Sequence, residues 1–116
     1  MKSYIFLLLI LVGAVLISCH KTDIPIAHTI KYIASADTFT FNVTYINDQK
    51  VAVTDSFVNN GWTEVFAIQN QSGFPAKLTI QSNAGHHVIA DIYVDQVKVA
   101  SSASDTGSAT VLYPVP

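Results

Sequence analysis

The chain has 116 residues, of which only 12% are charged, with six basic residues, all of them lysine, against eight acidic ones. This balance disfavours nucleic-acid binding, because a groove that follows phosphates needs clustered Lys and Arg, and bidentate phosphate recognition needs the arginine fork. The single cysteine, Cys19, excludes an internal disulfide and a cysteine-based zinc cluster, and the length fits one small domain.

The first 18 residues have the pattern of a secretory signal peptide. Met1 and Lys2 form a short positive segment, and residues 4–17 are an apolar run without a charge. A transmembrane helix is the alternative, but spanning a bilayer takes roughly 20 apolar residues and this run is shorter. We therefore predict a cleaved signal helix over residues 1–18.

The residues at the end of this run, Leu16, Ile17, Ser18 and Cys19, resemble the lipobox of bacterial lipoproteins. The resemblance implies cleavage just before Cys19, a diacylglycerol on its sulfur and an acylated amine, so Cys19 is the predicted lipidation site. Each buried methylene contributes about 0.8 kcal/mol, so two or three acyl chains hold a protein on a membrane that it does not cross. An ordinary signal peptide that leaves a free thiol is the alternative.

The membrane, contacted through this lipid, is the predicted partner. The predicted location is the bacterial cell envelope, on the periplasmic face or at the cell surface. Residues 19–27 lack a hydrophobic period and contain Pro25, which indicates a tether, and residues 28–116 form the predicted domain. At about 3.3 Å per extended residue, such a tether keeps the domain near its bilayer.

The first part of the domain is predicted to contain a β-hairpin at residues 38–58. Residues 38–46 alternate between apolar and polar side chains, the pattern of a half-buried strand. The apolar face of this strand comprises Phe39, Phe41, Val43 and Tyr45. After a turn at residues 47–50 the inward register is continued by Val51, Val53 and Phe57. Asp55 falls on the same face, where an unpaired carboxylate is costly, so we expect a bulge or a strand end there.

The rest of the chain alternates between turn clusters and short apolar runs. Further strands are predicted at residues 65–68, 76–81, 86–94, 97–100 and 110–113. The run 86–94 is the most uniformly apolar and suits a central strand, Asp95 and Gln96 can form a tight turn, and residues 101–108 are predicted to be a loop. Since no helical stripe persists beyond the signal peptide, we predict an all-β fold, an immunoglobulin-like antiparallel β-sandwich of about seven strands.

Three segments carry a resemblance to a known family. Trp62-Thr63-Glu64 before a strand, residues 78–83 before a glycine-containing turn, and residues 92–100 are similar to the MmpS-type β-sandwich domain of mycobacterial membrane proteins and small bacterial lipoproteins. The resemblance spans residues 28–112 and implies a β-sandwich without catalytic residues. Since mycobacterial members assist lipid and siderophore export, it also implies a transporter partner. This chain differs in having a lipobox instead of a transmembrane helix and Gln96 in place of a turn glycine.

The sequence offers little for metal binding or catalysis. His86 and His87 are adjacent, so in a strand they point to opposite faces, and His28 or an aspartate would have to join one of them to hold an ion. No nucleophile elbow of the G-x-S-x-G type is present, and Glu64 is the only glutamate. We therefore expect no metal, no cofactor and no enzymatic activity.

Three aromatic residues near the turns between the two halves, Trp62, Phe66 and Phe74, form the candidate binding surface for a glycan, a lipid or a protein. The alternative is that Trp62 fills one end of the core and Phe74 caps a turn, and side-chain exposure distinguishes the two. The expected function is that of a lipid-anchored, non-catalytic binding or accessory module. A lipid- or glycan-carrying domain, with a cavity between the sheets, and a small hydrolase, with a polar cleft, are the alternatives.

Overall fold

The computed structural model describes residues 27–69 and 71–116, which form eight strands. Their bounds are β1 Ala27–Ala36, β2 Phe41–Ile46, β3 Ala52–Val58, β4 Trp62–Gln69, β5 Pro75–Gln81, β6 Val88–Val94, β7 Val97–Ser104 and β8 Ser108–Pro114. All described pairings are antiparallel, so the predicted all-β sandwich is confirmed, with eight strands instead of about seven. The predicted signal helix and Cys19 lie outside the described residues.

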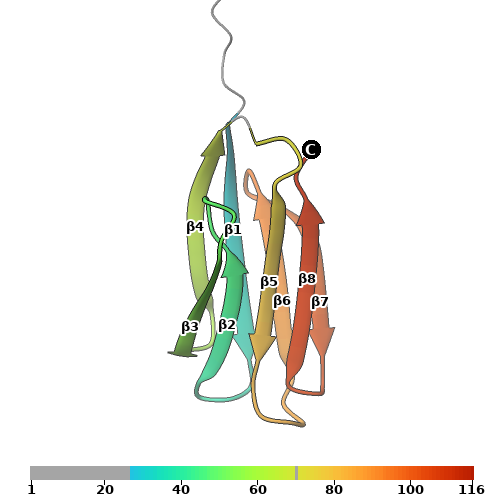
Figure 1. Cartoon of the computed structure of the whole chain (residues 1–116). Helices are drawn as coiled ribbons and strands as arrows, with labels where there is room; N and C mark the ends of the chain where they lie inside the picture. Colours follow the sequence, from blue (N-terminus) through green and yellow to red (C-terminus); the bar gives the residue numbers. More distant parts are fainter. Residues whose placement is uncertain (1–26, 70) are drawn as a thin grey trace, which may run out of the picture.

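The strands form two four-stranded sheets that pack face to face (Figure 1). The first sheet has the order β4-β1-β6-β7 and the second has the order β3-β2-β5-β8. The hairpins β2–β3 and β6–β7 stay within one sheet, whereas the other connections cross between sheets. Within the described residues, no helix is long and apolar enough to span a bilayer.

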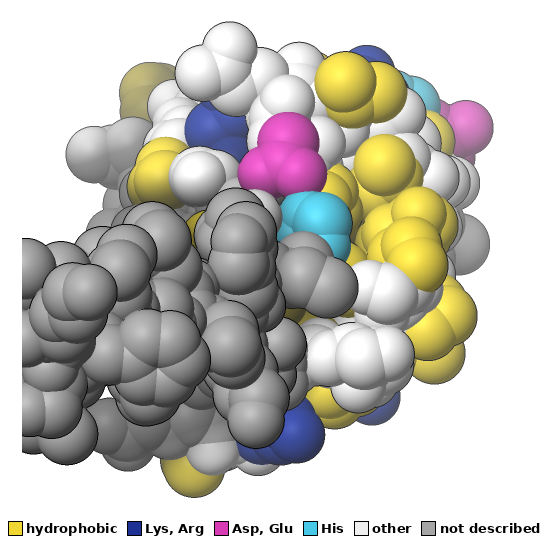
Figure 2. All heavy atoms as spheres, turned by 90° about the horizontal axis from the view of Figure 1, so that it is seen from above, with side chains coloured by type: hydrophobic (Ala, Val, Ile, Leu, Met, Phe, Trp, Pro, Cys, Tyr) yellow, Lys and Arg dark blue, Asp and Glu magenta, His cyan; other side chains and the backbone are white. Residues whose placement is uncertain are grey.

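Four loops lie together at the end of the sandwich opposite to the start of β1, and we call this the distal end (Figure 1). They comprise residues 37–40, 59–61, 82–87 and 105–107. Figure 2 looks onto the other end, where β1 begins. Backbone hydrogen bonds join the distal loops: Asp37 N–H donates to the His87 carbonyl over 3.1 Å, and Ser82 N–H donates to the Gly107 carbonyl over 2.7 Å. These bonds hold the distal end in one arrangement.

The core is made of the side chains that alternate inward from both sheets. Among the described residues no polar or charged side chain is buried, as expected for strands with one dry and one wet face. The buried members of β1, β2, β5 and β6 are Ile30, Tyr32, Ala34, Ala36, Phe41, Val43, Tyr45, Ala76, Leu78, Ile80, Val88, Ala90, Ile92 and Val94. The predicted inward face of strand 76–81 is therefore confirmed. β6 is central as predicted for the apolar run 86–94, and it is buried at alternate positions.

The predicted inward register of the hairpin is wrong at three positions. Phe39 is 96% exposed, because it lies in the β1–β2 loop before β2 begins at Phe41. Val51 is 53% exposed in the turn before β3, and Phe57 is 80% exposed on β3 itself. Alternation therefore fails in the loop before β2, in the turn between the two strands and near the end of β3.

A β-bulge explains the exposure of Phe57. Phe41 pairs with Val58 and Val43 pairs with Asp55, so two residues of β3 oppose Asn42 alone. Phe57 has a left-handed backbone with φ 58°. A bulge re-aims the side chains after it, and the irregularity expected near Asp55 is confirmed.

Two other turn predictions have opposite outcomes. Asp95 and Gln96 have φ 50° and 70°, the backbone of a two-residue type I′ turn, so the predicted tight turn forms without glycine. The predicted loop at residues 101–108 is wrong, because β7 continues to Ser104. Small polar residues are accommodated there since Ser101 pairs with Asp91 on β6 and donates a 2.6 Å hydrogen bond to its carboxylate.

Candidate functional site at the distal end

The three aromatic residues proposed from the sequence as a binding surface contribute to the interior. Phe74 is fully buried, so it cannot contact a partner, and Trp62 and Phe66 are partly buried and packed against the core. Phe66 packs edge-on to Phe74, with ring centroids 5.9 Å apart, and Trp62 lies 5.2 Å from Tyr45. Together with Tyr32, these rings fill the space between β1, β2 and β4.

Tyr32 joins the two sheets through its hydroxyl group. The hydroxyl donates to the carbonyl of Ile46 over 2.8 Å and accepts from the N–H of Lys77 at 3.3 Å, so a β1 side chain binds backbone groups of β2 and β5. Burial is the main cause that raises the pKa of Tyr32. This hydroxyl is therefore a structural link that stays protonated.

The described histidines each pair with a different aspartate. His86 contacts Asp37 at 2.9 Å, and His87 contacts Asp105 at 2.6 Å, both at the distal end. His28 contacts Asp95 at 2.7 Å near the start of β1, so it lies far from the other two. No group of three or more metal-ligating side chains is found among the described residues.

Hydrogen bonds lower the pKa of two of these carboxyl groups. For Asp37 the main cause is the backbone N–H of His87, followed by the hydrogen bond with His86. For Asp95 it is the hydrogen bond with His28, followed by the backbone N–H of Thr29. Both side chains are exposed carboxylates: Asp37 ties two distal loops together, and Asp95 ties the β6–β7 turn to β1.

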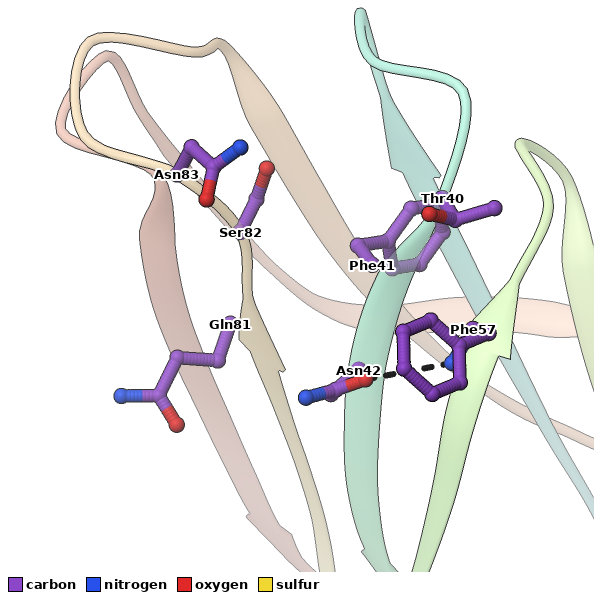
Figure 3. A pocket seen from close by; sticks show the side chains of 7 residues that line it. All are labelled: Thr40, Phe41, Asn42, Phe57, Gln81, Ser82 and Asn83. Atoms are coloured by element: carbon purple, nitrogen blue, oxygen red, sulfur yellow. Dashed lines mark hydrogen bonds between the residues drawn. The ribbon is translucent and has the colours of Figure 1, made fainter.

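A groove of about 320 Å³ opens at the distal end of the second sheet, and we call it the Phe57 groove. It is lined by Thr40, Phe41, Asn42, Phe57, Gln81, Ser82 and Asn83. Figure 3 shows Phe57 on one side and Gln81, Ser82 and Asn83 on the other, with Asn42 between them. The groove is thus built by the order β3-β2-β5, which places residues far apart in the sequence on either side of β2.

Hydrogen bonding fixes the aromatic wall of this groove. The backbone N–H of Phe57 donates to Oδ1 of Asn42 over 3.1 Å, which satisfies a donor that the bulge removes from the strand pairing. On the opposite wall, the Ser82 hydroxyl oxygen is buried and has no hydrogen-bond partner among the described residues. The Ser82 oxygen is thus inaccessible to a ligand, and the groove combines a fixed, exposed ring with the amides of Gln81 and Asn83, which make no side-chain hydrogen bond with the described residues.

The outer face of the second sheet continues the groove with two rows of uncharged polar side chains, beyond which lies the exposed Lys77 of β5. Asn42 pairs in register with Gln81, and Gln81 with Ser108. The next outward row, which we call the threonine row, consists of Thr54, Thr44, Thr79 and Thr110 on β3, β2, β5 and β8. Its hydroxyls are hydrogen-bonded in pairs, at 2.9 Å between Thr44 and Thr54 and at 3.2 Å between Thr79 and Thr110.

Sequence reasoning missed this groove. Alternation predicts that Phe57 lies in the core. For Asn42 it predicts only a position on the solvent-exposed face of its strand. One signal was present, since the unfavourable inward position of Asp55 indicated that the register of β3 breaks just before Phe57.

Comparison with protein-family models gives no match, and no curated protein matches the chain significantly. The resemblances to lipoproteins and to the MmpS-type domain therefore remain predictions that rest on the residues quoted above.

Proposed function

We propose that this chain is a lipid-anchored, non-catalytic binding module of the bacterial cell envelope, and that its distal end is the binding end. The observation that carries the proposal is the position of the Phe57 groove, at the end of the sandwich opposite to the start of β1. A lipid on Cys19 would act at the other end, because it precedes β1 in the chain. The groove would then face away from the membrane.

Other features of the distal end support a binding role over a catalytic one. General acid catalysis by a carboxyl group needs a raised pKa in a cleft, whereas the pKa of Asp37 is lowered and its side chain is exposed. The interior also favours a binding module over a lipid carrier. The rings of Tyr32, Tyr45 and Phe66 occupy the space between the sheets that a carried lipid would need.

Anchoring is tested by expressing the full chain in a bacterial host with a labelled fatty acid. We expect the wild type to incorporate the label and to fractionate with membranes, and Cys19→Ala to lose both properties. Ser18→Ala is the matched control, because it keeps a small residue before the cysteine and should still be lipidated. Retention of the Cys19→Ala chain in membranes, or a wild-type chain whose mass shows a bare thiol, would contradict the proposal.

A second candidate function is assistance to a membrane transporter, which the MmpS-type resemblance at residues 62–64, 78–83 and 92–100 favours. Crosslinking in intact membranes followed by purification of the lipidated chain tests it. Recovery of an export pump would support this role, and recovery of the chain alone would count against it.

A further inference from the structure

We propose that the Phe57 groove binds a neutral oligosaccharide, which extends along the threonine row of the second sheet. The inference rests on the proposed function only in treating the distal end as a binding end. It is independent of the lipid on Cys19.

The first argument is the chemistry of the lining. Asn42, Gln81 and Asn83 each carry an amide that can donate and accept hydrogen bonds. Oδ1 of Asn42 is occupied by the N–H of Phe57, which leaves its amino group to donate. Sugar hydroxyls also donate and accept, so they match such a set. A phosphate or carboxylate ligand would find no cation among the lining residues.

The second argument is the ring of Phe57. Its phenyl group is 80% exposed although its residue type is usually buried, and its φ of 58° is uncommon for a bulky residue. Strained backbones of this kind cluster at functional sites, where the surrounding structure holds them. An exposed ring beside amides can pack on the apolar C–H face of a pyranose while the amides bind its hydroxyls.

The third argument is the surface that continues from the groove. The threonine row lies two residues along the strands from the row of Asn42 and Gln81, which is about 6.6 Å. Each hydroxyl pair leaves lone pairs free on Thr44, Thr54, Thr79 and Thr110. These two uncharged rows, which end at Lys77, are longer than the groove and suit a chain of several sugar rings more than a single small molecule.

The loops that frame the groove are already bonded to one another. The Ser82 N–H binds the Gly107 carbonyl at 2.7 Å, and the Asp37 N–H binds the His87 carbonyl at 3.1 Å. A site that is ordered before binding loses less conformational entropy when the ligand arrives. This favours recognition of weakly binding ligands such as sugars.

The test uses the full chain in a detergent without a sugar headgroup. Maltohexaose, cellohexaose and laminarihexaose serve as neutral probes, an oligogalacturonate serves as the acidic probe and an uncharged peptide as the alternative ligand. We expect calorimetry to detect binding of at least one neutral hexasaccharide and neither of the other probes. No binding by any neutral probe at millimolar concentration, or preference for the acidic probe or the peptide, would overturn the proposal.

Two phenylalanines provide a matched pair of variants. Phe57→Ala should weaken neutral-sugar binding by at least about tenfold, because it removes the stacking surface. Phe39→Ala removes an even more exposed ring at the same end but outside the groove, and should leave the affinity within about twofold. Phe57→Gly relieves the positive φ, so it separates loss of the ring from loss of folding, and it should bind as weakly as Phe57→Ala.

The outcome is separable from the anchoring test. If Cys19→Ala remains membrane-bound and yet the purified chain binds a neutral hexasaccharide through Phe57, the anchoring proposal fails and the sugar site stands. If Cys19 is lipidated and Phe57→Gly binds sugars as the wild type does, the sugar site fails and the anchoring proposal stands.

Discussion

The two sheets present outer faces of different chemistry, and the difference indicates which face is built for a ligand. On the face of β4-β1-β6-β7, the ammonium of Lys31 lies 4.7 Å from the ring centre of Tyr93, and Lys98 lies 5.8 Å from it on the neighbouring strand. Asp91 is bound by Lys98 at 3.7 Å and by Ser101 at 2.6 Å. The charge of Asp91 is thus paired with that of Lys98, and both lysines lie against the ring of Tyr93.

On the face of β3-β2-β5-β8, the lining of the groove holds no charged side chain, and the exposed cation Lys77 lies beyond the threonine row. The amides and hydroxyls of this face have spare hydrogen-bonding capacity, and the ring of Phe57 is exposed beside them. A face whose polar groups bind each other stabilises strand pairing. The amides of Gln81 and Asn83, which make no side-chain hydrogen bond with the described residues, lie with an exposed ring in one groove, which is the composition of a binding site.

The largest expected loss in the free energy of unfolding comes from a substitution of Gly107, in the loop that packs against the Asn83 side of the groove. This glycine has φ 86°, and a Cβ there would lie 2.8 Å from the carbonyl carbon of Asn83 and still closer to its oxygen. Gly107→Ala should therefore displace Asn83, a lining residue of the groove, and lower the free energy of unfolding by about 2–4 kcal/mol. Chemical denaturation measures the loss.

Gly61 supplies the matched control for this variant. It has φ 82°, but a Cβ there would meet no atom within 4 Å. Gly61→Ala should cost only about 1 kcal/mol, from backbone strain alone. Equal losses for the two alanine variants would show that the contact with Asn83 is unimportant.

The next largest change in the free energy of unfolding is expected when one polar contact is removed from each face in turn. The Asp91 carboxylate is only 13% exposed, and Asp91→Ala removes its bonds to Lys98 and Ser101, so we expect a loss of about 1 kcal/mol in the free energy of unfolding. Thr44→Val removes one exposed hydroxyl pair from the threonine row and should change stability by less than about 0.5 kcal/mol. The reverse order, measured by thermal unfolding, would contradict the contrast between the faces.

The smallest effect at neutral pH involves the ends of the sandwich rather than its faces. The pKa values of Asp37 and Asp95 are lowered below the ordinary 3.8, so the folded state binds protons less readily than the unfolded chain. Their contribution is present above pH 3.8 and is lost as the pH falls through their folded pKa values. The wild type should therefore lose thermal stability in this acidic range.

Asparagine variants identify the groups responsible. Asp37→Asn and Asp95→Asn should each reduce the drop in unfolding temperature between pH 7 and about pH 3, because an amide does not titrate. Asp48→Asn is the control, since the Asp48 carboxylate makes no hydrogen bond with the described residues. If Asp48→Asn reduces the drop in unfolding temperature as much as the other two variants do, Asp37 and Asp95 are not the groups responsible.

The predictable part of the fold is the part in which alternation is undisturbed. The inward face of residues 76–81 follows from a period of two, and the uniformly apolar run 86–94 indicates the central position of β6. Phe57 could not be placed in this way, because a bulge on the edge strand β3 shifts the register within a single strand. Ser101 was assigned to a loop by its residue type, although pairing with Asp91 keeps it in β7.

The groove itself depends on pairings between strands that are far apart in the sequence, and the residue pattern within a single strand does not predict them. Asn42 faces Gln81 only because β2 lies between β3 and β5, and the loop that carries Asn83 is held to the β7–β8 loop by the hydrogen bond from the Ser82 N–H to the Gly107 carbonyl. The aromatic candidates Trp62, Phe66 and Phe74 were recognised as a cluster. Their location in the interior depends on how the two sheets pack.

The most direct test of the contrast between the faces is chemical-shift mapping of the isotope-labelled full chain with each of the three neutral hexasaccharides. The account predicts that amide signals of Asn42, Phe57, Gln81 and Asn83 shift with increasing sugar, while those of Lys31, Tyr93 and Lys98 stay in place. Shifts confined to the charged face, or none on the neutral one, would contradict it.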